Sequence, residues 1–293
     1  MNETKLYARA KINIGLDILG KREDGYHNLV SVMQSVYLAD EITVKKIDKP
    51  DYGIKVSVEN ANLPQDERNL AYKTALRVRE RYGIDTGIFI NLKKNIPVAA
   101  GLGGGSSDAA AVLIALRNLY GLNMDEAELY KVGLELGADV PFCLTRGTCL
   151  AEGVGERLRR LNPFPPAWFL LVKPPVHVST ADIFNKYSVG EKTMQRPDME
   201  RLLYGIRTGD LHEICREEVL VNVFEPITGA IYPVIYEIKK LCREYGALGA
   251  SMSGSGSTVF GVFIERESAD NAARRIKERL GYRDIIVTRG FNA

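Results

Sequence analysis

The feature that most constrains this chain is a glycine-rich stretch followed directly by an apolar, alanine-rich run. Residues 97–113 have the sequence PVAAGLGGGSSDAAAVL, with four glycines in positions 101–105. Glycine loses more backbone freedom on folding than other residues, so this density indicates a loop that approaches another group closely. Residues 106–108, Ser-Ser-Asp, suit a helix cap and first turn, and residues 109–119 favour a helix. Such a loop offers free N–H groups and a positive helix end, which favour phosphate.

Two common phosphate-binding motifs do not fit this loop. No Gly-Lys-Ser or Gly-Lys-Thr follows the glycines, as a P-loop requires. A dinucleotide fingerprint needs a strand directly before the glycines and an acidic residue about 20 residues further on. Residues 121–123, Gly-Leu-Asn, indicate the end of a helix instead. A flexible surface linker is the remaining alternative, but linkers are not followed by an apolar helix.

The string PVAAGLGGGSSDAA resembles the phosphate-binding motif of the GHMP kinases, a family named after galacto-, homoserine, mevalonate and phosphomevalonate kinases. The resemblance implies that the loop wraps the phosphates of ATP, and that a serine after the glycines helps to hold Mg²⁺. Ser107 is the expected metal ligand, with Ser106 as the other candidate. The residues assigned to ATP in this way are Pro97, Val98, Ala99, Ala100, Gly101, Leu102, Gly103, Gly104, Gly105, Ser106 and Ser107.

Two lysines, Lys93 and Lys94, precede the loop. A solvated charge is the ordinary expectation for an isolated lysine. The functional alternative is a contact with the nucleotide, which we assign to Lys94.

Residues 6–19 alternate imperfectly and predict the first strand of a sheet, with Lys11 and Asn13 on one face. A solvated strand face is again the ordinary interpretation. The phrase AKINIGLDILGKREDGYHNL, however, resembles the first motif of one GHMP branch, which acts on a cytidine diphosphate conjugate of methylerythritol. The resemblance implies a catalytic role for Lys11 and contact between Asn13 and the substrate.

Tyr26 and His27 follow a turn signal, Asp24-Gly25, and are expected to emerge from a loop. Packing is the commoner role of such a pair. A cytosine has a face that can stack and an edge that can form hydrogen bonds, and Tyr and His supply both interactions. The resemblance implies that Tyr26 stacks on the base, that His27 bonds its edge, and that Phe184 faces Tyr26 across it.

Asp139 lies in the string LGADVPF and has two possible roles. Asp suits an N-cap and Pro141 an early helical position, so Asp139 could simply cap the next helical turn. The same string carries the catalytic aspartate in the GHMP branch, which makes Asp139 the expected general base. Glu128 lies near the position of a second metal ligand in many relatives, but the local sequence does not match theirs, and its role stays open.

A kinase of this sort needs a cradle for the triphosphate, a cation and a group that acts on the acceptor hydroxyl. The resemblance implies that Asp139 takes the proton from the 2-hydroxyl of the acceptor. We expect Lys11 to lie beside Asp139, where its charge would keep the carboxylate ionised and stabilise an alkoxide or a loose transition state. Whether Asp139 abstracts the proton early or only orients the hydroxyl is left open.

Residues 249–263, GASMSGSGSTVFGVF, resemble the third GHMP motif, a glycine-rich loop that lies against substrate and phosphates. A flexible turn before a strand is the alternative. Residues 31–37 and 40–44 each predict a strand, and the proline-rich residues 162–166 predict a domain boundary.

The expected fold class is α+β, with the two domains of a GHMP kinase. Residues 1–160 would form an ATP-binding N-terminal domain of the ribosomal protein S5 domain 2-like type. Residues 161–293 would form a C-terminal substrate-binding domain with a ferredoxin-like split βαβ arrangement.

Composition limits the class of partner. The 293 residues carry a formal net charge of +2, which is too small to indicate a nucleic-acid or membrane surface. Four cysteines form no metal-like spacing, so free cytosolic thiols are expected. No signal peptide or membrane span is recognisable. We expect a cytoplasmic enzyme, a monomer or weak homodimer, that uses ATP, Mg²⁺ and a small-molecule substrate, without nucleic-acid or membrane partners.

Three other functions stay open at this point. A GHMP relative could act on a plain small alcohol such as mevalonate or homoserine, in which case cytidine nucleotides would not compete with its substrate. A GHMP fold could serve only as a nucleotide-responsive binding module, which loss of Lys11 or Asp139 would have favoured; both are present. An RNA-binding protein is disfavoured by the lack of a basic excess and of interleaved aromatic residues.

Overall fold

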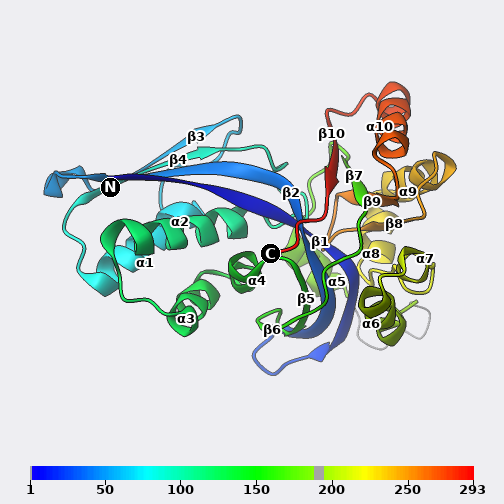
Figure 1. Cartoon of the computed structure of the whole chain (residues 1–293), viewed down its shortest axis with the longest axis horizontal. Coiled ribbons are helices and arrows are strands. Elements are labelled where there is room, and N and C mark those ends of the chain that lie inside the picture. The colour runs from blue at the N-terminus through cyan, green and yellow to red at the C-terminus, as the bar shows by residue number, and fades with distance from the viewer. Residues whose placement is uncertain (1, 188–194) are drawn as a thin grey trace. The chain divides into compact units, whose positions relative to one another are not determined.

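The computed structural model describes residues 2–187 and 195–293 (Figure 1). They form two compact units, each built from separate stretches of chain. Unit 1 contains Met1–Ala10, Leu38–Val98 and Gly103–Thr145, and unit 2 contains Lys11–Tyr37, Ala99–Leu102 and Arg146–Ala293. This grouping differs from the predicted division at residue 160, because two long N-terminal strands and the tip of the glycine-rich loop contribute residues to unit 2.

These two strands are β1 (Glu3–Lys21) and β2 (His27–Ile47). The prediction of two separate strands over residues 31–37 and 40–44 was wrong, because β2 is continuous through both. Within unit 1, the C-terminal part of β2 pairs antiparallel with β4 (Gly87–Lys93), which pairs parallel with β3 (Ile54–Glu59). A short 3₁₀ turn, η1 (Pro50–Tyr52), precedes β3.

Four helices complete unit 1: α1 (Leu70–Tyr82), α2 (Gly104–Tyr120), α3 (Glu126–Leu136) and α4 (Val140–Thr145). Helix α2 packs against the other three, and its apolar side covers the inward residues of the strands (Figure 1). Ile90 and Leu92 of β4 and Val112 and Leu116 of α2 are among the fully buried residues of this core. The alanine-rich composition of α2 allows this close packing on several sides.

Local chemistry explains how these helices begin and end. The Asn69 side chain caps α1, and Gly83, with φ of +61°, ends it. Ser106 and Ser107 lie in the first turn of α2, but the cap is Gly103, with φ of +69° and no side-chain cap hydrogen bond. The helix therefore begins inside the glycine cluster, because a left-handed Gly103 redirects the chain before the serines.

Unit 2 contains two groups of strands. The N-terminal part of β2 pairs with β5 (Thr148–Gly153), which pairs with β6 (Arg157–Arg160). A separate antiparallel sheet has the order β10-β7-β9-β8. Its strands are β7 (Trp168–Lys173), β8 (Gly249–Met252), β9 (Val259–Phe263) and β10 (Asp284–Arg289).

Helices α9 (Val234–Glu244) and α10 (Arg266–Leu280) pack on this four-stranded sheet (Figure 1). The chain order β7-α9-β8-β9-α10-β10 confirms the predicted ferredoxin-like split βαβ arrangement. Four shorter helices come between β7 and α9: α5 (Thr180–Lys186), α6 (Met199–Thr208), α7 (Leu211–Ile214) and α8 (Glu225–Ile231).

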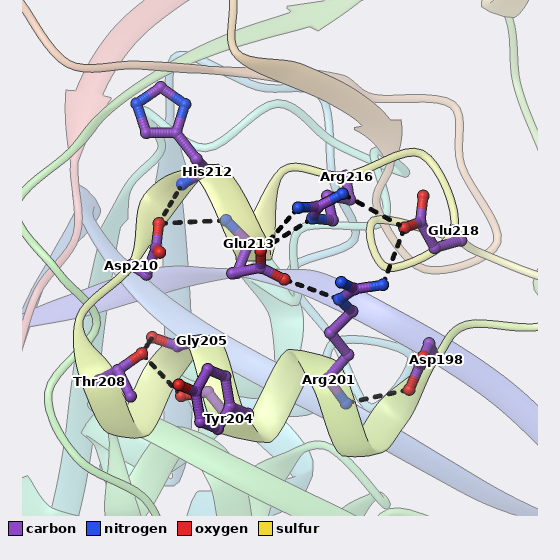
Figure 2. Close-up of polar contacts among 10 residues, drawn as sticks. All are labelled: Asp198, Arg201, Tyr204, Gly205, Thr208, Asp210, His212, Glu213, Arg216 and Glu218. Atoms are coloured by element: carbon purple, nitrogen blue, oxygen red, sulfur yellow. Dashed lines mark hydrogen bonds and ion pairs between the residues drawn. The ribbon is translucent and has the colours of Figure 1, made fainter.

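Figure 2 shows the polar contacts that join α6 and α7. Asp198 caps α6 by accepting a hydrogen bond from the backbone of Arg201, whose guanidinium contacts Glu213 at 2.7 Å and Glu218 at 3.3 Å. Asp210 caps α7. Because these ion pairs are partly solvated, each contributes about 1 kcal/mol or less to stability, and the network mainly fixes the turn between the helices.

All four cysteines are buried, and Cys149, Cys215 and Cys242 are free thiols. No helix among residues 2–187 and 195–293 combines the length and apolar character that crossing a membrane requires.

Candidate active site

Three stretches that are far apart in the sequence meet in unit 2. The backbone N–H of Lys11, on β1, donates to the carbonyl of Leu102 at 2.9 Å. The hydroxyl of Ser253, in the third motif, donates to the carbonyl of Gly101 at 3.0 Å. The first strand, the tip of the glycine-rich loop and the third motif are therefore held together by direct hydrogen bonds.

Gly101 is the position at which this contact requires glycine. Its φ is +74°, a conformation that residues with a side chain rarely adopt. A Cβ atom there would overlap the carbonyl oxygen of Ser253 and lie 2.9 Å from that of Gly256. The two glycine loops thus pack backbone against backbone, which is the close approach that the glycine cluster predicts.

Lys11 is buried, with 5% of its surface exposed, and does not lie on a solvated strand face. Its Nζ donates to Asn13 Oδ1 at 2.7 Å, and Asn13 Nδ2 donates to Ser31 Oγ at 2.9 Å. Ser31 in turn donates to the carbonyl of Gly15 at 2.7 Å. This chain of hydrogen bonds fixes the position of the ammonium group. The sequence analysis placed Lys11 and Asn13 together but missed Ser31.

The third motif is also held from its other side. Asn222 Nδ2 donates to the carbonyls of Met252 and Gly254, both at 2.7 Å, and Thr228 Oγ1 donates to the carbonyl of Ser255 at 3.1 Å. The sequence analysis missed Asn222 and Thr228. One signal was available, since Asn222 is a polar residue within the apolar string LVNVF.

An aromatic cluster surrounds His27 in unit 2. The imidazole centroid lies 5.4 Å from that of Phe184 and 6.5 Å from that of Tyr187, and Phe184 packs edge-on against Phe224 at 4.6 Å. Burial, followed by the charge of Lys21, lowers the pKa of His27 below its usual value. The imidazole is therefore neutral near pH 7 and carries one donor and one acceptor.

The structure brings two of the three predicted base-binding side chains into contact. His27 is 8% exposed and touches Phe184, whereas Tyr26 is 64% exposed. The predicted stacking of Tyr26 and Phe184 on opposite faces of a base stays a prediction. Tyr187 and Phe224 were not predicted to lie in this cluster, because nothing in the local sequence places either beside His27.

The first turn of α2, in unit 1, suits a phosphate group. Its N-cap, Gly103, offers no side chain to the first helical N–H groups, so these remain available to an anion. Ser107 is buried and its hydroxyl donates to the carbonyl of Gly104 at 2.9 Å, while Ser106 is partly exposed.

Lys94 does not follow the ordinary expectation of a solvated lysine. It is 7% exposed and forms ion pairs with Asp40 and with Asp108, the latter at 2.5 Å. Burial raises the pKa of the Asp108 carboxyl, and the neighbouring Lys94 ammonium opposes that rise.

Asp139 lies directly before α4, where its carbonyl accepts a hydrogen bond from Cys143 N at 3.1 Å. This position agrees with the capping role, and the catalytic role stays a prediction. Lys11 and Asp139 belong to different units, and their predicted proximity stays a prediction. The Glu128 carboxylate contacts Arg81 at 2.6 Å, so it takes part in the contact between α3 and α1.

The residues present fit the phosphates of ATP better than an isolated metal ion. Among residues 2–187 and 195–293, no group of three His, Cys, Asp or Glu side chains is placed to hold a metal. Mg²⁺ usually keeps several waters and binds through substrate phosphates with few protein ligands. A single hydroxyl such as that of Ser107 is compatible with that mode of binding.

Comparisons with known proteins identify the family of this chain. Residues 69–147 match the family model described as "GHMP kinases N terminal domain", and residues 202–281 match "GHMP kinases C terminal". Two relatives bear the name 4-diphosphocytidyl-2-C-methyl-D-erythritol kinase. The one from Caldicellulosiruptor saccharolyticus is 44% identical over 97% of this chain and 95% of its own length. The one from Pelotomaculum thermopropionicum is 46% identical over 97% of both.

A solved structure agrees as well. The crystal structure of a 4-(cytidine 5'-diphospho)-2C-methyl-D-erythritol kinase has a TM-score of 0.83 and 33% sequence identity, covering 99% of this chain and 100% of that one. The two family models and the near full-length relatives support the same assignment. This chain belongs to the GHMP kinase family.

Proposed function

We propose that this chain transfers a phosphoryl group from ATP to the 2-hydroxyl of 4-diphosphocytidyl-2-C-methyl-D-erythritol, a step in non-mevalonate isoprenoid precursor synthesis. The observation that carries the proposal is that hydrogen bonds join the three motifs. The N–H of Lys11 donates to Leu102, the hydroxyl of Ser253 donates to Gly101, and the N–H of Asn13 donates to Ser253. The names of the relatives and of the solved structure support the choice of substrate.

ATP would bind through the loop of residues 97–107. Backbone N–H groups at the start of α2 would donate to phosphate oxygens, and the helix dipole would favour their negative charge. Mg²⁺, which we assign to the phosphates and to Ser107, would neutralise the charge that develops during transfer. Lys94 would support nucleotide binding through its contact with Asp108 and its position beside Gly104, at the start of α2.

Asp139 would accept the proton of the acceptor hydroxyl or orient that hydroxyl for attack. Lys11 would act at the same hydroxyl, where an ammonium stabilises negative charge on the attacking oxygen. The hydrogen bond from Lys11 to Asn13 supports this role, because it holds the ammonium in one place before substrate arrives. Asn13 itself would also contact the substrate.

The cytosine would bind at the aromatic cluster of His27 and Phe184, with Tyr26 on its other face. A neutral His27 can donate one hydrogen bond and accept another, which suits the edge of a cytosine. Among the residues that the structure describes, no hydrogen bond engages the His27 ring, which supports its availability to a base. A small alcohol such as mevalonate or homoserine has no base that could stack in such a cluster.

We further propose that the protein is cytoplasmic, acts on small molecules, and is a monomer or a weak homodimer. The buried thiols of Cys149, Cys215 and Cys242, which form no disulfide, support a reducing compartment.

ATP turnover across a panel of acceptors tests the proposed function. We expect turnover with the cytidine diphosphate conjugate of methylerythritol, inhibition by cytidine nucleotides, and negligible turnover with mevalonate or homoserine. Turnover of a plain alcohol that cytidine nucleotides leave unchanged would assign the chain to another branch of the family.

A further inference from the structure

Three charged side chains are buried together in unit 1, next to the glycine-rich loop. Asp40 comes from β2, Lys94 follows β4, and Asp108 lies on α2. Their side chains are 0%, 5% and 4% exposed, respectively. We call this group the anchor cluster.

The anchor cluster connects the two ends of the loop. Lys94 Nζ donates to Asp40 Oδ2 and to Asp108 Oδ2, which joins the end of β4 to α2. Asp40 Oδ1 accepts hydrogen bonds from the backbone N–H groups of Asn95 at 2.6 Å and Ile96 at 2.8 Å. One carboxylate therefore binds the ammonium and two consecutive peptide groups at the point where the chain enters the loop.

The beginning of α2 rests directly on this arrangement. A Cβ atom at Gly104 would lie 3.3 Å from Ile96 Cγ2 and 3.6 Å from Lys94 Nζ. Gly104, the first helical residue, thus packs on the two residues that the cluster fixes, and its N–H group is among those available to a phosphate. Movement of Lys94 or Ile96 would move this N–H group.

Stability alone is a poor explanation for three buried charges. Removing ions from water costs several kcal/mol each, and apolar residues of similar volume often stabilise a fold as well or better. Asp108 Oδ1 is buried and has no hydrogen-bond partner within the described part of the chain, so even the paired cluster leaves one acceptor unused. If these residues position the ATP-binding loop, that role explains why the fold retains three buried charges in spite of their desolvation cost.

We propose that Asp40, Lys94 and Asp108 are positioning residues, which hold residues 94–96 and 104–108 in the arrangement that binds the triphosphate of ATP. This inference rests on the proposed function, because it takes the loop to be the ATP site. On this proposal, Lys94 affects the affinity for ATP because it fixes the backbone of the loop.

Two adjacent lysines provide a matched test. Lys94→Met removes the buried ammonium, whereas Lys93→Met removes a charge that is 43% exposed and pairs with Glu41. Asp108→Asn keeps the shape of the side chain and serves as a second variant, since Lys94→Met leaves two buried carboxylates unpaired and is at risk of misfolding. ATP affinity is measured by calorimetry, and KM and kcat by steady-state kinetics.

We expect Asp108→Asn and folded Lys94→Met to weaken ATP binding about tenfold or more. The KM for the acceptor and the kcat at saturating ATP should change about twofold or less, and Lys93→Met should match the wild type. Hydrogen exchange should also show faster exchange at the amides of Asn95 and Ile96 in Asp108→Asn. This split between nucleotide affinity and turnover would not result from a general loss of stability.

Unchanged ATP affinity in a folded Asp108→Asn variant would overturn the proposal, as would an equal loss in Lys93→Met. These results differ from a failure of the proposed function. If wild-type protein does not bind ATP, the assignment of the loop is wrong; if wild type binds ATP and the variants bind equally well, only the anchor cluster is refuted.

Discussion

His27 and Phe184 face each other in unit 2, with ring centroids 5.4 Å apart and an interplanar angle of 48°. Phe184 is supported from behind by Phe224, at a centroid distance of 4.6 Å. This packing presents an aromatic face and a neutral imidazole together. The pair supplies the two interactions that a pyrimidine base needs, stacking and hydrogen bonding along its edge.

Removing either proposed stacking side chain should weaken binding of the cytidine substrate selectively. Loss of a stacked aromatic residue typically costs about 1–3 kcal/mol per base, so Phe184→Ala and Tyr26→Ala should raise the KM for the acceptor about 5- to 150-fold. The KM for ATP should stay close to that of wild type. Tyr204→Ala, at an exposed tyrosine on α6, is the control. Equal effects on acceptor and ATP would argue against a base-binding role.

The lowered pKa of His27 predicts an acid-sensitive site. Its usual value is 6.5, and burial favours the neutral ring in the folded protein. The stability that this contributes is present above pH 6.5 and is lost as the pH falls through the lower folded-state pKa. Acceptor KM should rise over the same range because protonation changes the hydrogen-bonding pattern of the ring.

The control for this pH dependence is His27→Gln, which cannot titrate. Its urea-unfolding free energy and its acceptor KM should vary less with pH than those of wild type. If wild type and His27→Gln have parallel pH profiles between pH 5 and about 7, another group controls the acid limb.

Substitution by alanine at two positions of the glycine-rich stretch should change the stability of the protein in opposite directions. Gly101→Ala adds a Cβ atom against the carbonyl of Ser253, at a residue with φ of +74°, and should destabilise the protein by about 1–3 kcal/mol or more. Gly105 lies in α2, and a Cβ there meets no heavy atom within 4 Å. Gly105→Ala should therefore stabilise the fold by up to about 1 kcal/mol.

Thermal or urea unfolding of both variants measures this difference. The comparison concerns stability only, because both residues lie in the proposed ATP site. A Gly101→Ala variant as stable as wild type would show that the two glycine loops do not pack as closely as described.

Local patterns predicted much of this structure. The alternation around Lys11 and Asn13 placed both on one strand face, where they form a hydrogen bond. The ferredoxin-like split βαβ arrangement expected for residues 161–293 agrees with the order of strands and helices in the structure. These features depend on neighbouring residues, whose spacing is visible in the sequence.

The features that were missed depend on residues far apart in the chain. Lys94 is buried because Asp40 and Asp108 pair with it, and these lie 54 and 14 residues away. Asn222 is separated by 30 residues from Met252, whose carbonyl it binds. Burial of a charge or amide is set by such partners, and no local pattern identifies them.

The continuity of β2 was missed for a related reason. Tyr37 is an exposed large side chain, and the next residues interrupt the alternation, so the apolar pattern separates into two segments. The backbone nevertheless continues as one strand because it pairs with β5 in unit 2 and with β4 in unit 1. Pairing partners, rather than side-chain pattern, define the length of this strand.

The central claim is that Asp139 and Lys11 act on the acceptor hydroxyl while the loop of residues 97–107 binds ATP. The most direct measurement is phosphoryl transfer by Asp139→Ala in the presence of the cytidine substrate, together with ATP affinity measured on the same preparation. We predict a loss of about 10²- to 10⁴-fold in kcat with ATP affinity close to that of wild type. Turnover within a few-fold of wild type would contradict the account.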